Sequence, residues 1–334
     1  MPRRPPAVAR VLERVTKTAR EHEMFAPGEL VLVSCSGGPD STCLLYALWH
    51  LRRLFRIRLA VFHFDHRLRD DSAKDAAYVR ALATRLRLPF HLRVAEDAPV
   101  KGESVEAWGF LARSRARSSV ADEIGATKIA RAQTVDDRAE WVLVCLMAGA
   151  GPLGLAGPAP RHDADVQPLF DVTRQEVLAF CRALHLRPRW DPTNEDTSKL
   201  RAAIRHRVLP LMDDIRRGGA TKAIARTADQ LRTLEPLIRR EVGTRGGGST
   251  RSDGGFRFSV DRFHDPRYEF VGRMSLASEF RLMGHRITEA DVEAVIDLAR
   301  GRPGRRRDLS GGLKAVREKG YVRVSRASAA SPAS

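Results

Sequence analysis

The stretch Ser36-Gly37-Gly38-Pro39-Asp40-Ser41 decides how the chain around it folds. It follows the apolar run Leu30 to Val33 and precedes Thr42 to Leu51, so the order predicts a strand, a tight turn and a helix start. Two adjacent glycines tolerate positive φ and let backbone N–H groups approach a ligand closely. Ser41 and Thr42 add hydroxyls at a helix N-terminus, which favours anions. The stretch therefore predicts a phosphate-binding loop.

An ordinary glycine turn is the alternative, and the loop alone leaves it open. The stretch has neither the Gly-Lys-Ser/Thr ending of a Walker loop nor the G-x-G-x-x-G turn of a dehydrogenase. The first strand-to-helix turn is nevertheless the place where open α/β sheets bind phosphates. The rest of the site must therefore come from residues further along the chain.

Strands and helices alternate on both sides of this loop. Strands are predicted at Glu29 to Cys35, Arg58 to Phe64, Phe90 to Val94 and Thr127 to Ala132. Helices are predicted around Val8 to Val15, and at Ser72 to Arg87, Ser104 to Ile124 and Asp136 to Met147. This alternation is typical of an α/β fold with a doubly wound parallel sheet.

Polar residues follow two of the predicted strands. Asp65-His66-Arg67-Leu68-Arg69 ends the second strand, where it is either a turn or part of a ligand site. Asp136 and Asp137 open a helix after the fourth strand, and Glu140 follows one turn later. One such carboxylate is usually a helix cap, but adjacent carboxylates opposite a phosphate loop favour a Mg²⁺ site.

The composition indicates a polyanionic partner. The 334 residues include 58 Lys and Arg against 41 Asp and Glu, a formal net charge of +17. Nucleic acid fits this excess better than a membrane, since no amphipathic basic anchor stands out; drift toward arginine is the alternative. The four cysteines form no C-x-x-C pair, and no apolar span of about 18 residues occurs. We expect a cytoplasmic protein with no membrane association.

The second half of the chain divides into smaller parts. Thr173-Arg174-Gln175-Glu176 predicts a capping box with no functional role, and Ser198 to Val208 predicts a short basic helix. Two sets of arginines are either solvated surface or RNA contacts: Arg201, Arg205 and Arg207, and Arg305, Arg306 and Arg307. The expected parts are an N-terminal helix (1–27), a catalytic domain (28–212), a helical arm (213–242), a small α+β domain (243–324) and a disordered tail (325–334).

Three motifs in order resemble those of the PP-loop ATP pyrophosphatases, and most of all those of the tRNA(Ile)-lysidine synthetases. They are Ser36 to Ser41, His63-Phe64-Asp65-His66-Arg67-Leu68-Arg69, and Asp136-Asp137-Arg138-Ala139-Glu140. The resemblance continues in Gly154-Leu155-Ala156-Gly157, Pro168-Leu169, Trp190-Asp191-Pro192-Thr193-Asn194, and Arg201 to Pro210. It covers roughly residues 28 to 212, and the rest more loosely.

The resemblance implies an adenine nucleotide alpha hydrolase-like fold and a tRNA-modifying activity. ATP and Mg²⁺ would be cofactors, and the partners would be an isoleucine tRNA with a CAU anticodon and free L-lysine, with a homodimer possible. The wobble cytidine would be adenylated through O2, and lysine would then displace AMP at C2. The implied nucleotide-binding residues are Ser36, Gly37, Gly38, Pro39, Asp40, Ser41, Thr42, His63, Asp65 and His66. The implied catalytic residues are Asp40, Asp136, Asp137 and Arg113, with the three carboxylates also holding the metal.

The chain departs from the family pattern at several positions. Gln133 and Thr134 stand where a histidine usually precedes the carboxylate pair, and Arg138 stands where the family usually has glutamine. Trp141 replaces a usual threonine, and Phe110 replaces the first of two arginines, of which Arg113 is the second. Glutamine can hydrogen-bond but cannot carry a proton. Two alternatives therefore stay open: another PP-loop tRNA-modifying or amidating enzyme, and a catalytically weakened tRNA-binding relative.

Overall fold

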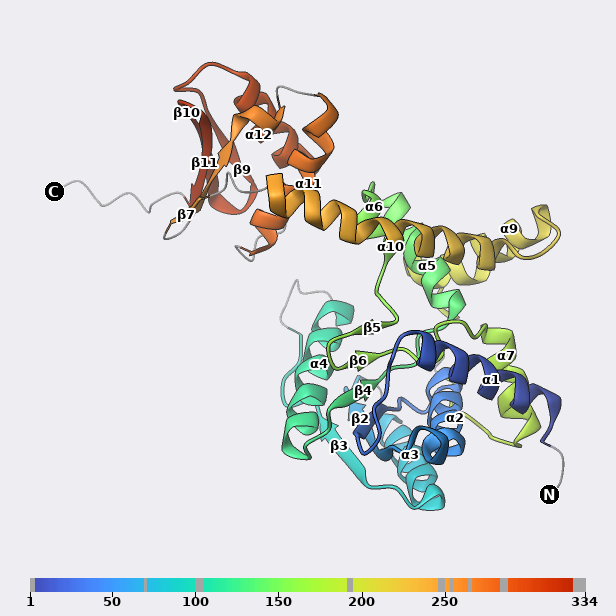
Figure 1. The fold of residues 1–334 in the computed structure, drawn as a ribbon. Coiled ribbons are helices and arrows are strands. Elements are labelled where there is room, and N and C mark those ends of the chain that lie inside the picture. Colours follow the sequence, from blue (N-terminus) through green and yellow to red (C-terminus); the bar gives the residue numbers. More distant parts are fainter. Residues whose placement is uncertain are drawn as a thin grey trace. The chain divides into compact units, whose positions relative to one another are not determined.

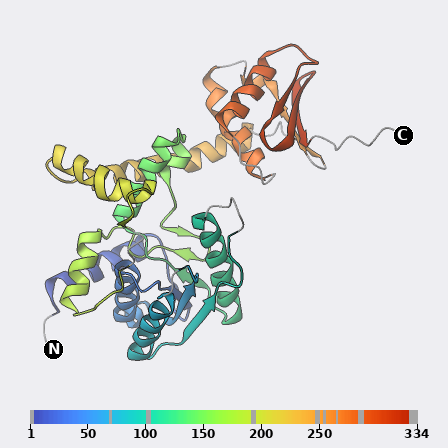
Figure 2. The same ribbon diagram turned by 180° about the vertical axis from the view of Figure 1, so that it is seen from behind.

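A computed structural model describes residues 4–68, 71–99, 105–190, 195–245, 250–252, 255–263, 266–282 and 288–326. The chain packs as two compact units, which divide between Arg232 and Thr233. Figures 1 and 2 show the elements of both units from opposite sides. Within the described ranges, no helix is long and apolar enough to cross a membrane.

A six-stranded sheet in the order β3-β2-β1-β4-β6-β5 forms the centre of the first unit. Neighbouring strands run parallel except at the β5–β6 edge, and β1 lies between β2 and β4. The predicted doubly wound parallel sheet is thereby confirmed. Its strands are β1 (Leu30–Ser34), β2 (Arg58–Asp65), β3 (Phe90–Val94), β4 (Lys128–Ala130), β5 (Arg161–His162) and β6 (Asp165–Val166).

Helices cover both faces of this sheet (Figure 1). Because strand side chains alternate between faces, Val31 and Val33 pack beneath α1, α2, α3 and α7, whereas Leu32 packs beneath α4. The helices are α1 (Pro6–Glu21), α2 (Pro39–Phe55), α3 (Ser72–Leu86), α4 (Val105–Glu123), α5 (Val135–Met147), α6 (Pro152–Ala156), α7 (Arg174–Ala183), α8 (Leu200–Ala203), α9 (Leu209–Ile215) and α10 (Ala220–Arg245).

The segment expected as one basic helix, Ser198 to Val208, is instead α8 followed by a π-helical turn, Ile204–Val208. Pro210 gives a physical reason, because it has no N–H to donate to the preceding turn of an α-helix. The Leu209 N–H bonds to the Ile204 carbonyl instead. Ile204 and Leu209 consequently both pack against Ala139, although five residues apart in an α-helix they would point in different directions.

The division between the units falls inside α10, within the expected helical arm (213–242). Helix α9 and the first turns of α10 belong to the first unit, where Arg138 and Arg232 bond to groups of both α10 and the core.

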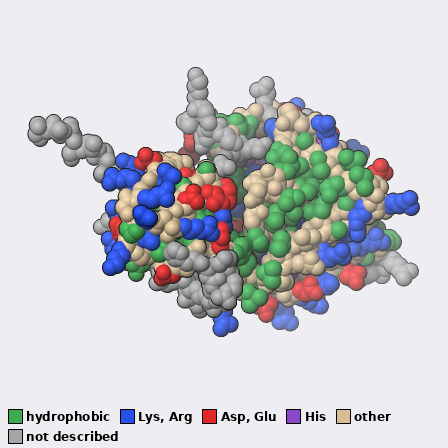
Figure 3. Space-filling model, turned by 90° about the horizontal axis from the view of Figure 1, so that it is seen from above, with side chains coloured by type: hydrophobic (Ala, Val, Ile, Leu, Met, Phe, Trp, Pro, Cys, Tyr) green, Lys and Arg blue, Asp and Glu red, His purple; other side chains and the backbone are tan. Residues whose placement is uncertain are grey.

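Hydrophobic side chains gather on the surface of the larger body in Figure 3. The exposed apolar side chains of the first unit include Leu146 and Met147 on α5 and Leu211 and Ile215 on α9.

The second unit is an antiparallel sheet packed on two helices, as expected for a small α+β module. The strand order is β7-β8-β11-β10-β9, and the core includes Phe256, Phe258 and Phe280. The elements are β7 (Thr250–Ser252), β8 (Gly255–Ser259), a 3₁₀ turn (Val260–Phe263), α11 (Pro266–Leu282), α12 (Glu289–Arg300), β9 (Arg306–Leu309), a 3₁₀ turn (Ser310–Gly312), β10 (Leu313–Glu318) and β11 (Tyr321–Arg326).

Some of the expected features fall on residues outside the described ranges. The expected tail begins at the end of β11, and residues 327–334 are among those not described. Of the motif Trp190 to Asn194, only Trp190 is described, and Arg69 of the motif after β2 is likewise outside the ranges.

Candidate functional site: a phosphate loop facing carboxylates and arginines

The loop between β1 and α2 is organised around the hydroxyl of Ser41. Its Oγ accepts hydrogen bonds from the backbone N–H groups of Ser36 (3.1 Å) and Gly37 (3.2 Å), and it donates to the Gly38 carbonyl (3.1 Å). The Thr42 hydroxyl donates to the Gly37 carbonyl at 3.3 Å. These bonds hold the loop backbone in a curled conformation around the Ser41 hydroxyl, which occupies the N–H groups of Ser36 and Gly37.

The helix that follows the loop begins with free donors. Gly38 is the N-cap of α2 and supplies no side-chain cap, and Pro39 occupies the first turn. The orphan N–H groups and the helix dipole both favour an anion at this end. Gly37 has φ of +93°, and a Cβ there would lie 3.4 Å from Tyr78 and Val79. The backbone conformation therefore favours glycine, whereas the space would admit a Cβ in ordinary van der Waals contact.

Two carboxylates at the start of α5 already have partners. Asp137 closes a capping box with Thr134, accepting from the Thr134 backbone N–H at 2.9 Å. Asp136 accepts from the backbone N–H of Arg174, the first residue of α7, at 2.8 Å. Asp136 and Asp137 can therefore both cap a helix and bind a metal ion or another ligand, because each carboxylate has a second oxygen for another partner.

Glu140, one turn further along α5, has no exposed surface and is neutralised by arginine. Arg205 donates from Nε to Glu140 Oε1 at 2.5 Å and from Nη2 to Oε2 at 2.8 Å, and the same Nη2 lies 3.4 Å from Asp137. Arg201, which is mostly exposed, lies 3.9 Å from Glu140. Burial raises the pKa of Glu140, against the opposing effect of Arg205. The π-helical turn that carries Arg205 therefore positions it between two carboxylates of α5.

Asp40, in the first turn of α2, is the least satisfied carboxylate of the site. Its Oδ1 is buried without a hydrogen-bond partner, and its Oδ2 lies 3.5 Å from Arg174. Burial raises the pKa of Asp40 to about 7, and the negative charge of Asp137 contributes to the rise. A buried carboxylate of this kind is stabilised by a cation.

These residues fit Mg²⁺ as a partner shared with phosphates rather than as an all-protein cage. Among the residues that the structure describes, no three Asp, Glu, His or Cys side chains converge on one point as a ready-made metal site. Mg²⁺ usually keeps waters and binds one or two carboxylates together with substrate phosphates. The Oδ1 atom of Asp40, which has no hydrogen-bond partner and lies beside the loop, is an oxygen ligand of the kind that Mg²⁺ binds.

The residues at the end of β2 surround a second part of the site. His63 is buried with Nδ1 2.8 Å from the Cys35 carbonyl, and Asp65 accepts from the Arg67 N–H at 2.9 Å. His66 lies between the rings of Phe64 and Trp108. Burial lowers the pKa of His66 to about 4, with a further effect of Arg113, so its imidazole is neutral at physiological pH.

Two adjoining cavities share Ser36, Asp75 and Arg113 in their walls. One, of about 640 Å³, is lined by Asp136, Glu140 and Arg205, and the other, of about 610 Å³, by His63, Asp65 and His66. The second also contains Arg117 and Arg131. Burial and the nearby Arg131 lower the pKa of Arg117 to about 10, against the opposing charge of Asp165. The second cavity has more cationic than acidic side chains in its walls, so it carries a net positive charge.

The structure also includes residues that the sequence did not single out. Arg174 contacts both Asp40 and Asp136, although its segment was expected to be a plain capping box. The box is present, and Arg174 is simply its first helical residue. Arg189 donates its backbone N–H to the Gly37 carbonyl at 2.9 Å, and its side chain pairs with Asp75 at 2.7 Å. Neither has a local sequence signal, because each reaches the loop from a distant element.

The candidate RNA-binding arginines fall into two groups. Arg205 is partly buried in ion pairs, whereas Arg201 and Arg207 are exposed on the same segment. Arg305, Arg306 and Arg307 are all exposed in the second unit, at or beside its edge strand β9. Within the first unit, Arg205 and, more loosely, Arg201 lie beside the carboxylates of α5.

The departures from the family pattern have different structural surroundings. Phe110 is 48% exposed, and Gln133 has a buried Oε1 without a hydrogen-bond partner. The Trp141 indole donates to the Gly154 carbonyl at 3.0 Å, and its ring lies where a Cβ of Gly157 would be 3.1 Å away. Arg138 turns away from the site and bonds to Asp229 of α10. Trp141 and Arg138 thus serve packing around α5.

A family model described as the PP-loop domain matches residues 8–212. The tRNA(Ile)-lysidine synthase of Thermosynechococcus vestitus is 32% identical over 69% of this chain and 67% of its own length. The chain belongs to the tRNA(Ile)-lysidine synthase family. The relative from Symbiobacterium thermophilum is 38% identical over 68% of the chain and 49% of its own length, and that from Thermus thermophilus is 34% identical over 89% and 57%. The chain spans about half the length of most of these relatives.

A solved structure supports the same fold at lower sequence identity. The U34-tRNA thiolase NcsA from Methanococcus maripaludis, with its [4Fe-4S] cluster, superimposes with a TM-score of 0.57 at 18% identity. The match covers 67% of this chain and 78% of that one. At this identity the likeness shows the fold alone, and that fold agrees with the family model.

Proposed function

We propose that the protein joins lysine to C2 of the wobble cytidine in an isoleucine tRNA with a CAU anticodon, at the expense of ATP. The observation that carries the proposal is the position of Asp40 and the α5 carboxylates opposite a Ser41-centred phosphate loop. Arg174 touches Asp40 and Asp136, and Arg205 touches Asp137 and Glu140, so both sides of the cavity are linked by arginines. Family membership supplies the substrates.

The loop's role in this proposal is to hold the β- and γ-phosphates of ATP. The Ser41 hydroxyl keeps the loop in its curled conformation, and the N–H groups at the start of α2, which no side chain caps, are the donors for the phosphates. His63, Asp65 and His66 line the adjoining cavity, where they are suited to contact the nucleoside part. A fixed loop of this kind positions the α-phosphate for attack by cytidine O2, with pyrophosphate as the leaving group.

The arginines then stabilise the negative charge at the α-phosphate. Arg113 lines both cavities, and Arg117 and Arg131 raise the positive charge of the same wall. Donors fixed in a partly buried site need no reorganisation during the reaction. When bound, Mg²⁺ would neutralise phosphate charge, held by Asp40 with Asp136 or Asp137. In the second step the amino group of lysine forms a bond to C2 and AMP leaves.

The RNA side of the proposal rests on charge. The formal net charge of +17 and the exposed Arg201, Arg207, Arg305, Arg306 and Arg307 suit binding to tRNA phosphates. The place of action would be the cytoplasm, where tRNA, lysine and ATP are together.

The direct test mixes the purified protein with ATP, Mg²⁺, radiolabelled lysine and isoleucine tRNA bearing a CAU anticodon. We expect lysine incorporation that depends on ATP, with equal amounts of pyrophosphate and AMP released. Incorporation of ammonia or sulfur instead would indicate another PP-loop activity, and tRNA binding without pyrophosphate release would indicate a non-catalytic relative. Either result overturns the proposal.

A matched pair of variants tests the site. Asp40→Asn removes the buried carboxylate beside the loop, and we expect it to abolish pyrophosphate release while the fold persists. Asp163→Asn makes the same chemical change at a highly exposed position in the turn between β5 and β6, and should leave the activity unchanged. Equal turnover of the two variants would show that Asp40 has no part in adenylation.

A further inference from the structure

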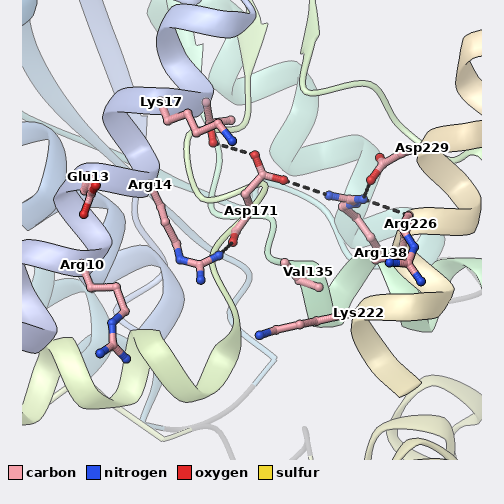
Figure 4. Close-up of a pocket in the computed structure, with 12 residues that line it drawn as sticks. Arg10, Glu13, Arg14, Lys17, Val135, Arg138, Asp171, Lys222, Arg226 and Asp229 are labelled. Atoms are coloured by element: carbon pink, nitrogen blue, oxygen red, sulfur yellow. Dashed lines mark hydrogen bonds and ion pairs between the residues drawn. The ribbon is translucent and has the colours of Figure 1, made fainter. Parts of the chain in front are cut away.

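A third cavity in the first unit, of about 600 Å³, lies apart from the nucleotide site (Figure 4). Its walls come from α1, the start of α5, the residue Asp171 before α7, and the first turns of α10. No residue lines both this cavity and either of the two cavities at the loop. Helix α5 separates them, because Asp136 and Glu140 face the loop whereas Val135 and Arg138 face this cavity.

Six cationic and three acidic side chains line this cavity. The acids are Glu13, Asp171 and Asp229, and the cations are Arg10, Arg14, Lys17, Arg138, Lys222 and Arg226. The charge excess is positive even before individual pairs are considered. An excess of one sign in a hollow focuses the field and attracts the opposite charge.

Arg138 and Arg14, the two inner cations, are paired with acidic groups or with a backbone carbonyl. Arg138 lies 2.5 Å from Asp229 and 3.5 Å from Asp171, and Arg14 pairs with Glu176 at 3.0 Å and donates to the Asp171 carbonyl at 3.0 Å. Arg138 is only 3% exposed, and its Nε has no hydrogen-bond partner in the described structure. These residues form a fixed, neutralised floor.

The outer cations are left with little compensation. Arg10, Lys222 and Arg226 are exposed, and Lys17 has only a weak surface pair with Glu21 at 3.7 Å. Figure 4 shows Arg10 on the α1 side, beyond the paired Arg14, with Lys222 reaching toward that side from α10. Lys222 and Arg226 are four residues apart and so lie on one face of α10. Two walls of cations thus face each other across one hollow.

We propose that this cavity binds phosphates of the RNA backbone, as a contact to the tRNA substrate away from the reacting cytidine. A polyanion with regularly spaced charges can engage both walls at once, and exposed Lys and Arg are the groups that contact phosphates without reading bases. The proposal rests on the proposed function for the identity of the RNA. It adds residues of α1 and α10 to the RNA-binding surface.

The test is RNA binding as a function of salt, measured by fluorescence anisotropy with labelled isoleucine tRNA and no ATP or lysine. The variant is Lys222→Gln with Arg226→Gln in the full chain, and Arg10→Gln probes the opposite wall. Each lost phosphate contact should lower the slope of log K against log salt by about 0.7–0.9. We expect weaker binding and a slope reduced by about 1 to 2 for the double variant.

The matched control is Arg53→Gln with Arg85→Gln, which removes the same charge from exposed positions on α2 and α3 outside the cavity. We expect it to keep the parent slope. An unchanged slope for the cavity variants, or the same change as in the control, would overturn the proposal. A second measurement is calorimetry with free pyrophosphate. If the cavity variants lose pyrophosphate binding, the control keeps it, and the salt slope for tRNA stays that of the parent, then the cavity binds a small anion and the proposal is overturned.

The binding readout separates this inference from the proposed function. If the cavity variants show the expected change in slope but the parent protein forms no lysidine, the cavity contact is supported and the proposed chemistry is contradicted. Conversely, lysidine formation with unchanged tRNA binding in the cavity variants retains the chemistry and excludes the contact. Circular dichroism of each variant checks that the fold is intact.

Discussion

The Arg205 guanidinium lies 2.5 Å from a Glu140 carboxylate that has no exposed surface, and this ion pair joins a π-helical turn to α5. A buried charge that loses its partner is strongly destabilising, at about 3–5 kcal/mol. We therefore expect Arg205→Met to lower the free energy of unfolding by that order, as measured by urea denaturation. Arg201→Met, which removes a largely exposed partner 3.9 Å from the same carboxylate, should cost less than about 1 kcal/mol. Equal costs would mean that Glu140 is not neutralised by Arg205.

Gly37 tests the loop. Gly37→Ala places a Cβ at φ of +93° within the loop, so we expect both strain of about 1–2 kcal/mol and, because the loop backbone must shift, weaker ATP binding. Gly28→Ala is the control, because Gly28 has φ of +89° but open space around the added carbon. Both variants should lose similar stability in thermal unfolding, and only Gly37→Ala should raise the KM for ATP. An unchanged KM would remove the loop from nucleotide binding.

Asp40 gives a pH dependence of stability. Its folded-state pKa of about 7 is above the ordinary value of 3.8, so the folded protein holds the proton more tightly than the unfolded chain. The contribution of this group to stability therefore falls as the pH rises from about 4 to about 7. We expect Asp40→Asn to lack this fall, in urea denaturation without Mg²⁺ at about pH 5 and about pH 8. Parallel pH profiles for variant and parent would contradict the raised pKa.

Arg138 tests the attachment of α10 to the core. The guanidinium donates to the carbonyls of Phe170 and Ala225, both at 3.0 Å, and stacks 3.8 Å from the centre of the Phe170 ring. Arg138→Gln, the residue usual in the family, should cost about 1–3 kcal/mol through the lost hydrogen bonds to the two carbonyls, because Asp171 and Asp229 are 43% and 42% exposed and remain hydrated. Adding Asp229→Asn should then cost little more, since that carboxylate has already lost its pair. A double-mutant cycle in urea denaturation measures this coupling.

The sheet and its phosphate loop are readable from the sequence because both depend on local patterns. Short apolar runs mark the strands, and Gly37 and Gly38 mark the turn, so the predicted strand Phe90 to Val94 matches β3 at both ends. The central strand β4 is shorter than predicted, because only Lys128–Ala130 pairs with β1, and of these only Ile129 and Ala130 also pair with β6. Pairing partners, unlike apolar runs, are not local information.

The arginine contacts of the site could not be predicted for the same reason. Arg174 looks like an ordinary residue of a capping box, and its contact with Asp40 depends on where α7 packs. Arg138 belongs to the carboxylate motif, yet it points to α10, because residues one apart on a helix face different directions. Arg205 was singled out for its charge, but its orientation follows from the π-helical turn.

That turn makes the length of the segment as important as its composition. Deleting one residue between Ile204 and Leu209 would restore α-helical phase and turn every later side chain by about 100°. Leu209 would leave the contact that it shares with Ile204 against Ala139, and α9 would enter in a new direction. A single-residue deletion here is therefore expected to be more damaging than most substitutions, since it moves a whole helix rather than one side chain.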